Sequence, residues 1–348
     1  MTPGQIFLLI LTLNPTQAQD ILDSPDCKFT EDIYQSTSLG KKWSYQDFSS
    51  WDYGCRNGQL QSPIDLPRAN VVGKEMGNLT FQYYASSPLL QRIVNTGHSI
   101  MMDSCDIGDR QPKISGSGLN GTYVFHQMHF HWADINRYIA FIIKKAPSID
   151  IFFHSKGSEH SKSKTHFPLE LQLLHYQEEF GSYERAKNQP EGLAIVAVLF
   201  QLVVEKNTRI DRIFPLLETI TSPYMETILE APIPLANLLP GNTDRFFRYH
   251  GSLTAPPCTE NVIWTIFQSP IPILLKQMKY FRAILSPPGD QDRYRISRPL
   301  GHNVRPLMKT NGRIIFSNLI PEDIQATSSS TLYKSVFYVI LTLLLFVQ

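Results

Sequence analysis

The stretch Gln127-Met128-His129-Phe130-His131-Trp132 is the most informative part of the chain. Successive side chains of a β-strand point to opposite faces, so His129 and His131 share one face and Phe130 lies on the other. Two imidazoles on one strand supply half of a tetrahedral zinc site, and a catalytic zinc needs a third protein ligand and one open position. The stretch therefore predicts a strand that carries part of a metal site.

A second stretch with the same alternation, Glu170-Leu171-Gln172, follows about forty residues later. Period two places Glu170 and Gln172 on one face, so Gln172 is the candidate for the third ligand. Each feature alone also has an ordinary structural explanation. A histidine pair of this spacing is about as often structural as metal-binding, and a buried carboxylate usually serves an ion pair.

The composition indicates a folded protein that does not bind nucleic acid. The chain has 348 residues, 42% of them hydrophobic and 11% aromatic, which is enough to bury a large core. Its 32 basic and 31 acidic residues nearly cancel, and no stretch concentrates Lys or Arg into a surface that could neutralise a phosphate backbone.

Six segments rich in branched and aromatic residues, bounded by Gly, Pro, Ser or Asn, predict β-strands. They are residues 79–84, 89–94, 122–131, 169–176, 194–204 and 262–267. Helical patterns are short and confined to 208–220 and 276–285. We therefore expect a mainly β protein of the α+β class, with one domain, a large and mainly antiparallel sheet and short peripheral helices.

The N-terminus predicts entry into the secretory pathway. Residues 1–18 contain a short apolar run at 5–13 and end in the small residue Ala18, as a signal peptide does, although no Lys or Arg precedes the run. In an oxidising compartment four cysteines can form two disulfides, with three possible pairings, although buried free thiols are the alternative. The cysteines are Cys27, Cys55, Cys105 and Cys258. Two sequons predict glycosylation of Asn78 and Asn120.

The C-terminus, residues 323–348, predicts a lipid anchor. Small residues at 326–330 precede a short spacer and an almost wholly apolar run at 336–347. This run is too short to cross roughly 30 Å of hydrocarbon as a helix. Small residues, a spacer and an apolar tail form the signal that is replaced by a glycosylphosphatidylinositol (GPI) anchor. A short tilted transmembrane tail is the alternative.

Further motifs accompany the two strands of the predicted site. They are Gln61-Ser62-Pro63-Ile64, Asn95-Thr96-Gly97-His98, Gly157-Ser158-Glu159-His160, the run from Gly251 to Glu260, and Asn303-Val304-Arg305-Pro306. With His129-Phe130-His131-Trp132, they resemble the alpha-class carbonic anhydrases from about Trp43 to Phe316. The resemblance implies a central, mostly antiparallel ten-stranded sheet within a domain at 19–322, a zinc cofactor, and carbon dioxide and bicarbonate as substrates.

The resemblance also assigns roles at the metal. His129 and His131 match zinc ligands, and the third histidine of the family falls on Gln172. Gln127 and Glu170 match positions that orient the first and third ligands. An amide oxygen is a neutral donor that suits harder cations better than zinc, so we expect weaker zinc affinity.

Other matches concern catalysis. Thr254 and Glu159 match the pair that orients the attacking oxygen, and His98 matches the proton shuttle, for which an ordinary pKa near 6.5 is suitable. The apolar wall that holds carbon dioxide matches Leu174, Ile195, Leu253, Val262 and Trp264. The disulfide of secreted members matches Cys55 and Cys258, which leaves Cys27 to pair with Cys105.

Three departures from the family pattern complete the sequence prediction. Gln172 is the first, and His175 does not replace it, because an offset of three places it on the opposite strand face. Loss of a zinc histidine also occurs in carbonic anhydrase-related proteins that bind partners without catalysis. Ala255 removes a hydroxyl near the substrate. Residues 135–155 are an apparent insertion, because the interval from His131 to Glu159 is twenty-eight residues instead of about ten; a surface loop or a retained intron would explain it.

Overall fold

The computed structural model describes residues 29–30, 42–67, 71–105, 110–133, 157–203, 210–289, 296–301 and 303–318. The predicted signal peptide, Cys27, the insertion at 135–155 and the predicted anchor signal lie outside these residues. Among the described segments, no helix combines the length and apolar character needed to span a membrane.

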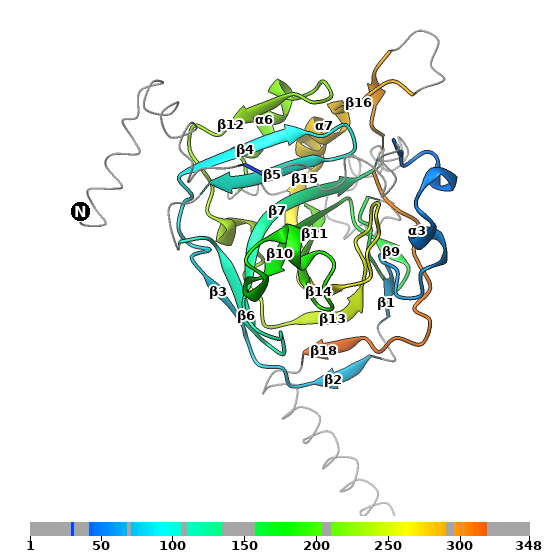
Figure 1. Cartoon of the computed structure of the whole chain (residues 1–348). Helices are drawn as coiled ribbons and strands as arrows, with labels where there is room; N and C mark the ends of the chain where they lie inside the picture. The colour runs from blue at the N-terminus through cyan, green and yellow to red at the C-terminus, as the bar shows by residue number, and fades with distance from the viewer. Residues whose placement is uncertain are drawn as a thin grey trace, which may run out of the picture.

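One large twisted sheet runs through the molecule (Figure 1). The ten strands along its continuous path are, in spatial order, β12 (Glu226–Ile228), β4 (Leu90–Asn95), β5 (Ile100–Cys105), β7 (Tyr123–Trp132), β10 (Leu169–Gln177), β11 (Leu193–Val203), β14 (Val262–Phe267), β13 (Phe246–Gly251), β18 (Phe316–Asn318) and β2 (Val72–Lys74). Only the β11–β14 and β18–β2 neighbours along this path are parallel. The predicted mostly antiparallel, ten-stranded sheet is therefore confirmed.

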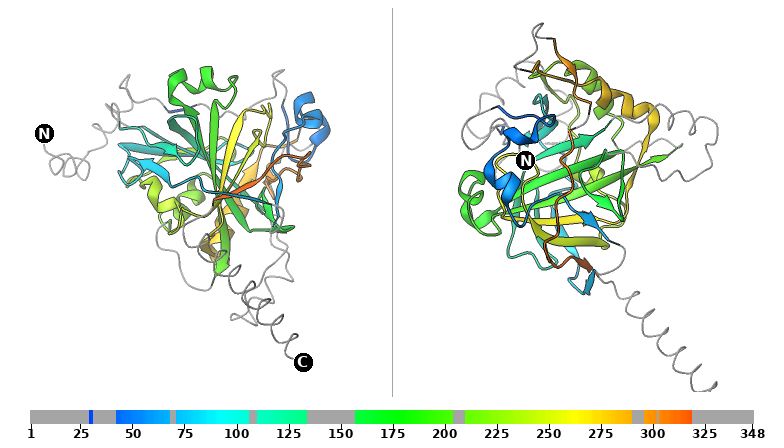
Figure 2. Two further views of the ribbon diagram at one scale, coloured as in Figure 1. Left: turned by 90° about the horizontal axis from the view of Figure 1, so that it is seen from below. Right: turned by 90° about the vertical axis from the view of Figure 1, so that its right-hand side faces the viewer.

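Shorter strands extend this sheet or form small separate ones. β15 (Ile271–Leu274) pairs with β11, and β3 (Leu79–Gln82) pairs with β6 (Lys113–Gly116), which joins β7. The separate strands are β1 (Asp65–Leu66), β8 (Ser161–Lys162) and β9 (Thr165–His166) in one sheet, and β16 (Leu285–Ser286) and β17 (Arg298–Pro299) in another. Figure 2 shows how strongly the central strands fan out across the molecule.

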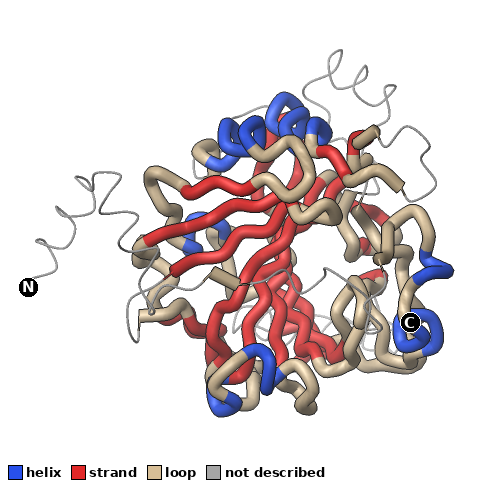
Figure 3. The backbone as a smooth tube through the Cα atoms, turned by 45° about the horizontal axis from the view of Figure 1, so that its top comes forward, coloured by secondary structure: helices blue, strands red, loops and turns tan. Residues whose placement is uncertain are grey.

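The described helices are short and peripheral, as predicted (Figure 3). They are α3 (Tyr53–Asn57), α5 (Tyr183–Ala186), α6 (Ile213–Thr219) and α7 (Leu275–Ala283), with the 3₁₀ turns η1 (Phe48–Ser50), η2 (Glu178–Phe180) and η3 (Leu235–Leu238). α6 and α7 pack against each other and correspond to the two helices predicted from sequence.

All six predicted strands exist, as β3, β4, β7, β10, β11 and β14, with ends that differ by at most a few residues. Their side chains enter two buried clusters on opposite faces of the sheet. On β7, Met128 and Phe130 belong to the larger cluster. His129 and His131 therefore point to the other face, where Leu174 and Trp264 belong to the second cluster. We call this second face the site face.

Candidate metal centre

The two strands of the predicted site are neighbours in the sheet. β7 and β10 pair antiparallel, with Gln172 opposite His129 and Glu170 opposite His131. All four side chains are almost completely buried. Directly opposed residues on adjacent strands share a face, so the register places both histidines and Gln172 together on the site face.

His131 is held in one tautomer. Its Nδ1 lies 2.8 Å from the backbone carbonyl oxygen of Asn303, which can only accept, so Nδ1 carries the proton and donates it. Nε2 then bears the lone pair, and it is buried without a hydrogen-bond partner. This is the arrangement expected of a nitrogen that binds a cation, because a backbone carbonyl commonly orients a metal-binding imidazole.

Gln172 presents its oxygen to the site. Its amide nitrogen donates to Oε2 of Glu159 at 2.9 Å and to Oε1 of Glu170 at 3.0 Å. Ionised carboxylates accept but cannot donate, so these contacts fix which end of the amide is nitrogen. Oε1 of Gln172 is buried and has no hydrogen-bond partner. The two carboxylates thus hold the amide so that a neutral oxygen donor remains.

Glu170 is an anion that organises this side of the site. Besides Gln172, it accepts from the backbone nitrogen and from Nδ1 of His160, each at 2.8 Å. Burial by itself would raise the pKa of Glu170, but the interactions with His160 outweigh it and hold this pKa below its ordinary value. The carboxylate therefore stays ionised and remains an acceptor for the amide of Gln172.

His129 is neutral. Burial, and secondarily the neighbouring His131, hold the pKa of His129 well below its usual range. Its Nε2 lies 2.7 Å from the amide nitrogen of Gln127. The predicted contact between Gln127 and the first histidine is therefore present, and an uncharged imidazole is the form that binds metals.

The donor atoms of this site fit a divalent cation. Within the segments that the structure covers, no group of three or more His, Cys, Asp and Glu side chains is arranged to hold a metal ion. A third donor at this site would have to come from another residue type, and Oε1 of Gln172 is buried and unpartnered beside the two histidines. Two imidazoles and one amide oxygen form a neutral set with mixed nitrogen and oxygen character.

Residues 41–319 match the family model described as "Eukaryotic-type carbonic anhydrase". The chain belongs to this family. It is 33% identical to carbonic anhydrase 15 of Mus musculus over 283 residues, covering 79% of each chain. It is 33% identical to putative carbonic anhydrase 3 of Caenorhabditis elegans, over 78% of this chain and 96% of the relative. Carbonic anhydrase 12 of Homo sapiens is 30% identical, over 80% of this chain and 73% of the relative.

The remaining residues predicted from the carbonic anhydrase motifs lie around the same site. Glu159 accepts from the backbone nitrogen of Arg305 at 3.0 Å through Oε1, while its Oε2 accepts from Gln172. Thr254 is fully buried, and its Oγ1 has no hydrogen-bond partner. The expected contact between Thr254 and Glu159 is therefore not formed in this structure. Both oxygens of Glu159 instead accept from other residues, Oε1 from Arg305 and Oε2 from Gln172.

His98 lies at the edge of the site in an unusual environment. Its ring stacks on Trp43, with centroids 4.1 Å apart and an angle of 10° between the planes. Burial lowers the pKa of His98 to about 4. At this position the ring is neutral and a weak base at pH 7, and the role of His98 as a proton shuttle stays a prediction.

The five residues of the predicted apolar wall all belong to the buried cluster on the site face; they are Leu174, Ile195, Leu253, Val262 and Trp264. Trp264 satisfies its indole nitrogen by donating to the carbonyl oxygen of Ser252 at 3.0 Å. Ala255 is also fully buried in this cluster. His175 lies on the other face, where its Nε2 is 2.5 Å from the hydroxyl of Tyr84, which confirms that it cannot replace Gln172.

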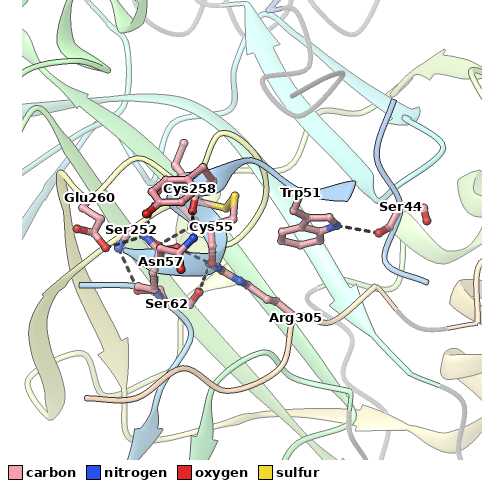
Figure 4. Close-up of a disulfide and its surroundings, with 12 residues drawn as sticks. Ser44, Trp51, Cys55, Asn57, Ser62, Ser252, Cys258, Glu260 and Arg305 are labelled. Carbon is pink, nitrogen blue, oxygen red and sulfur yellow. Dashed lines mark hydrogen bonds between the residues drawn. A yellow bond between two sulfur atoms is a disulfide. The ribbon is translucent and has the colours of Figure 1, made fainter. Parts of the chain in front are cut away.

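The disulfide between Cys55 and Cys258, implied by the family resemblance, is confirmed (Figure 4). It joins α3 to the loop that carries Thr254. Gln61 donates to the carbonyl oxygen of Cys258 at 3.1 Å, and Arg305 donates to Oε1 of Gln61 at 2.8 Å and to the carbonyl oxygen of Cys55. Disulfide and hydrogen bonds together connect this loop to Arg305, whose backbone nitrogen contacts Glu159. Cys27, the expected partner of Cys105, lies outside the described residues, so that pairing stays a prediction.

Three residues with roles at the site were not assigned from sequence. They are Asn303, which orients His131; His160, which holds Glu170; and Arg305, which contacts Glu159. All three lie inside motifs that carried the resemblance. The motifs therefore contained the signal, but the contacts of Asn303 and Arg305 join residues more than a hundred positions apart through backbone atoms, and that of His160 joins two different motifs.

Proposed function

We propose that this chain is a zinc-dependent carbonic anhydrase that catalyses the reversible hydration of carbon dioxide to bicarbonate and a proton at the cell surface. Membership of the carbonic anhydrase family supports carbon dioxide as the substrate. One observation carries the proposal for this particular chain: Gln172 is held by Glu159 and Glu170 so that its oxygen is the unpartnered atom beside His129 and His131.

His129, His131 and Gln172 would hold the zinc. All three donors are neutral, so the metal keeps its full dipositive charge, as it does with three histidines. Bound zinc lowers the pKa of a coordinated water to near 7. Because an amide oxygen is a poorer match for zinc than an imidazole, we expect the change at Gln172 to weaken affinity more than it impairs the chemistry.

The protein itself contributes positioning and proton transfer. The apolar cluster on the site face offers carbon dioxide a surface without competing hydrogen bonds. Thr254 has an unused hydroxyl that can orient the attacking oxygen. His98 is neutral at pH 7 and can accept a proton, but while it stacks on Trp43 its pKa of about 4 makes it a weak acceptor. Proton export through His98 therefore requires a more solvated position of the ring.

A second candidate is a catalytically weak or inactive carbonic anhydrase-related binding protein at the cell surface. One observation favours it: Gln172 bonds to Glu159, while the hydroxyl of Thr254 has no partner. If Gln172 keeps Glu159 engaged, Thr254 loses the acceptor that would fix the direction of its hydrogen. The protein would then keep the fold and the metal ligands but orient the attacking oxygen poorly.

The cell-surface location rests on separate observations. A disulfide between residues 203 positions apart indicates folding in an oxidising compartment. The sequon residues Asn78 and Asn120 are both exposed and accessible to glycosylation. The C-terminal pattern supports a GPI anchor. Release of the protein from intact cells by a phosphoinositide-specific phospholipase tests the anchor, and retention would favour a transmembrane tail.

Metal content and carbon dioxide hydration, measured together on the secreted domain, distinguish the two functions. We compare the wild type with Gln172→His and with Gln201→His, a control substitution on β11 at a partly buried position. The enzyme proposal predicts zinc and activity in the wild type and the control, with tighter zinc binding in Gln172→His. Substoichiometric zinc and no hydration in the wild type, with both appearing only in Gln172→His, would establish the inactive protein instead.

A further inference from the structure

Two residues from outside the family match lie against the sheet beside the metal centre. Phe29 and Thr30 precede residue 41, where the match begins, and both are half-buried. The backbone nitrogen of Thr30 donates to Oδ2 of Asp103 at 2.7 Å, and its carbonyl oxygen accepts from Arg92 at 2.7 Å. The guanidinium of Arg92 also lies over the ring of Phe29, 4.7 Å from its centroid. This stretch is therefore docked by several separate contacts.

The ring of Phe29 also has an apolar contact on the sheet. Leu90 on β4 and Cys105 on β5 lie opposite each other and form a small buried cluster, against which Phe29 packs. Cys105 lies four residues after Met101, which is paired with His129, so this cluster is on the site face. Phe29 is therefore held on the same side of the sheet as the predicted metal ligands.

Asp103 carries the polar part of this docking. It lies on β5 two residues after Met101, so its side chain is also on the site face. Its carboxylate is fully buried and forms an ion pair with Arg92 at 2.9 Å. A buried charge is costly unless it is paired and hydrogen-bonded. The two bonds from Thr30 to this carboxylate are thus strong, charge-assisted ones, and they favour the docked position of the stretch.

The hydroxyl of Thr30 extends from β5 to β7. Its Oγ1 is 2.9 Å from Oδ2 of Asp103 and 2.8 Å from Oε1 of Gln127. Gln127 is fully buried, and its amide nitrogen lies 2.7 Å from Nε2 of His129. A single side chain therefore separates Thr30 from the first predicted metal ligand. Met101, on the same face and opposite His129, is only 1% exposed.

The metal centre is buried to a degree that calls for an opening step. The side chains of His129, His131 and Gln172 are at most 2% exposed, although water and a small solute have to reach them for any reaction at a metal. Phe29 and Thr30 lie on the polar groups beside these ligands but lie outside the family domain. Their movement away from the sheet would expose this side of the site without breaking a strand.

We propose that Phe29 and Thr30 belong to an intramolecular cover of the metal centre, docked by Arg92 and Asp103, which limits how fast solutes reach the site face. The cover acts as an autoinhibitory contact, and its release increases access to the centre. That the covered centre binds metal rests on the proposed function. The cover itself does not, because access to Met101 can be measured in the protein without metal.

The test compares a release variant with a matched control in the full chain. The release variant, Phe29→Gly with Thr30→Pro, removes the ring, the hydroxyl and the backbone N–H that dock the stretch. The control, Phe29→Tyr with Thr30→Ser, keeps all three groups. Both also carry Cys27→Ser and Cys105→Ser, so that the disulfide predicted between these cysteines cannot hold the stretch in place. Urea denaturation checks that the two variants are equally folded.

Oxidation of methionine by dilute hydrogen peroxide reports access to the site face. Accessible methionine is converted to its sulfoxide, and mass spectrometry of fragmented peptides assigns the rate to each residue. Met101 is the probe. Met102 belongs to the cluster on the opposite face and reports general loosening of the fold. Met225 is 48% exposed and reports the strength of the oxidant.

We expect slow oxidation of Met101 in the wild type and the control. In the release variant it should be at least about tenfold faster, because each lost bond to a charged acceptor shifts the opening equilibrium by about that factor or more. Met225 should react quickly and Met102 slowly in every protein. Equal rates at Met101 in the release variant and the control overturn the inference, as does an equal acceleration at Met102.

Carbon dioxide hydration by the zinc-loaded proteins gives the second readout. The release variant should be faster than the control at low carbon dioxide concentration, where access contributes most to the rate. Equal hydration rates, although Met101 has become accessible, overturn the claim that the cover limits access to the metal. If oxidation of Met101 depends on the stretch but the wild type binds no zinc, the cover is established and the proposed function fails.

Discussion

The carboxylate of Glu170 is expected to be a major source of stability because it binds three donors in a fully buried position. Two donors belong to His160 and one is the amide of Gln172. Glu170→Gln preserves size but replaces one acceptor oxygen by an NH₂ group, which must face at least one of these donors. Leaving a buried donor unsatisfied costs about 1–3 kcal/mol, and bonds to a charged acceptor are worth about 1.5–3 kcal/mol each. We therefore expect Glu170→Gln to lower the free energy of unfolding by about 2–5 kcal/mol.

Urea denaturation at pH 7.5, followed by tryptophan fluorescence, measures this loss. Glu178→Gln is the matched control, because Glu178 pairs with Lys113 at 2.6 Å but its side chain is 46% exposed. The control should lose less than about 1 kcal/mol. A loss in Glu170→Gln no larger than in the control would refute the claim that this carboxylate organises the site.

Three further predictions follow from individual contacts. Trp43→Ala removes the ring that buries His98, so the pKa of His98 should rise from about 4 towards 6.5 in an NMR titration; an unchanged value contradicts this account. Cys258→Ser opens a disulfide with a sequence separation of 203 and should lower the free energy of unfolding by about 2–5 kcal/mol in denaturation experiments; a much smaller loss would show that hydrogen bonds alone hold the loop. Burial lowers the pKa of His126, which stacks on Tyr183, to about 4. The neutral ring of His126 therefore stabilises the fold above pH 6.5, and this contribution to the free energy of unfolding is lost as the pH falls towards 4. His126→Phe should reduce this acid-induced loss by on the order of 1 kcal/mol in denaturation experiments at both pH values. An unchanged pH dependence of the free energy of unfolding would contradict the assignment.

Strands with a long branched or aromatic pattern were predictable even where buried polar residues interrupt it, as in β7 and β10, whereas a short strand around a buried charge was not. The pattern of β7, β10 and β14 is apolar and branched or aromatic over most of its length. β13 (Phe246–Gly251) was missed because it contains Arg248, whose guanidinium is buried and donates to Thr265 and to the backbone of Ser117. The partners that make burial of this charge tolerable come from other parts of the chain, and a local pattern does not contain them.

At the site, too, local periodicity predicted which side chains share a face, but not the contacts that join distant segments. Period two was sufficient to predict that His129 and His131 share a face and that His175 does not lie on it. It did not predict the low pKa of His98, because the ring that buries it, Trp43, lies on a distant segment. Nor did it predict the bond between Gln172 and Glu159, since that contact depends on how two separate segments meet.

The central claim is that Oε1 of Gln172 is the third donor of the metal centre. Zinc dissociation constants, measured by chelator competition for the wild type, Gln172→Leu and Gln172→His, test it without reference to activity. If the oxygen binds the metal, Gln172→Leu should bind zinc more weakly than the wild type by more than the roughly 10–100-fold that orienting groups contribute, and Gln172→His should bind more tightly. Equal affinities for the wild type and Gln172→Leu would contradict the claim.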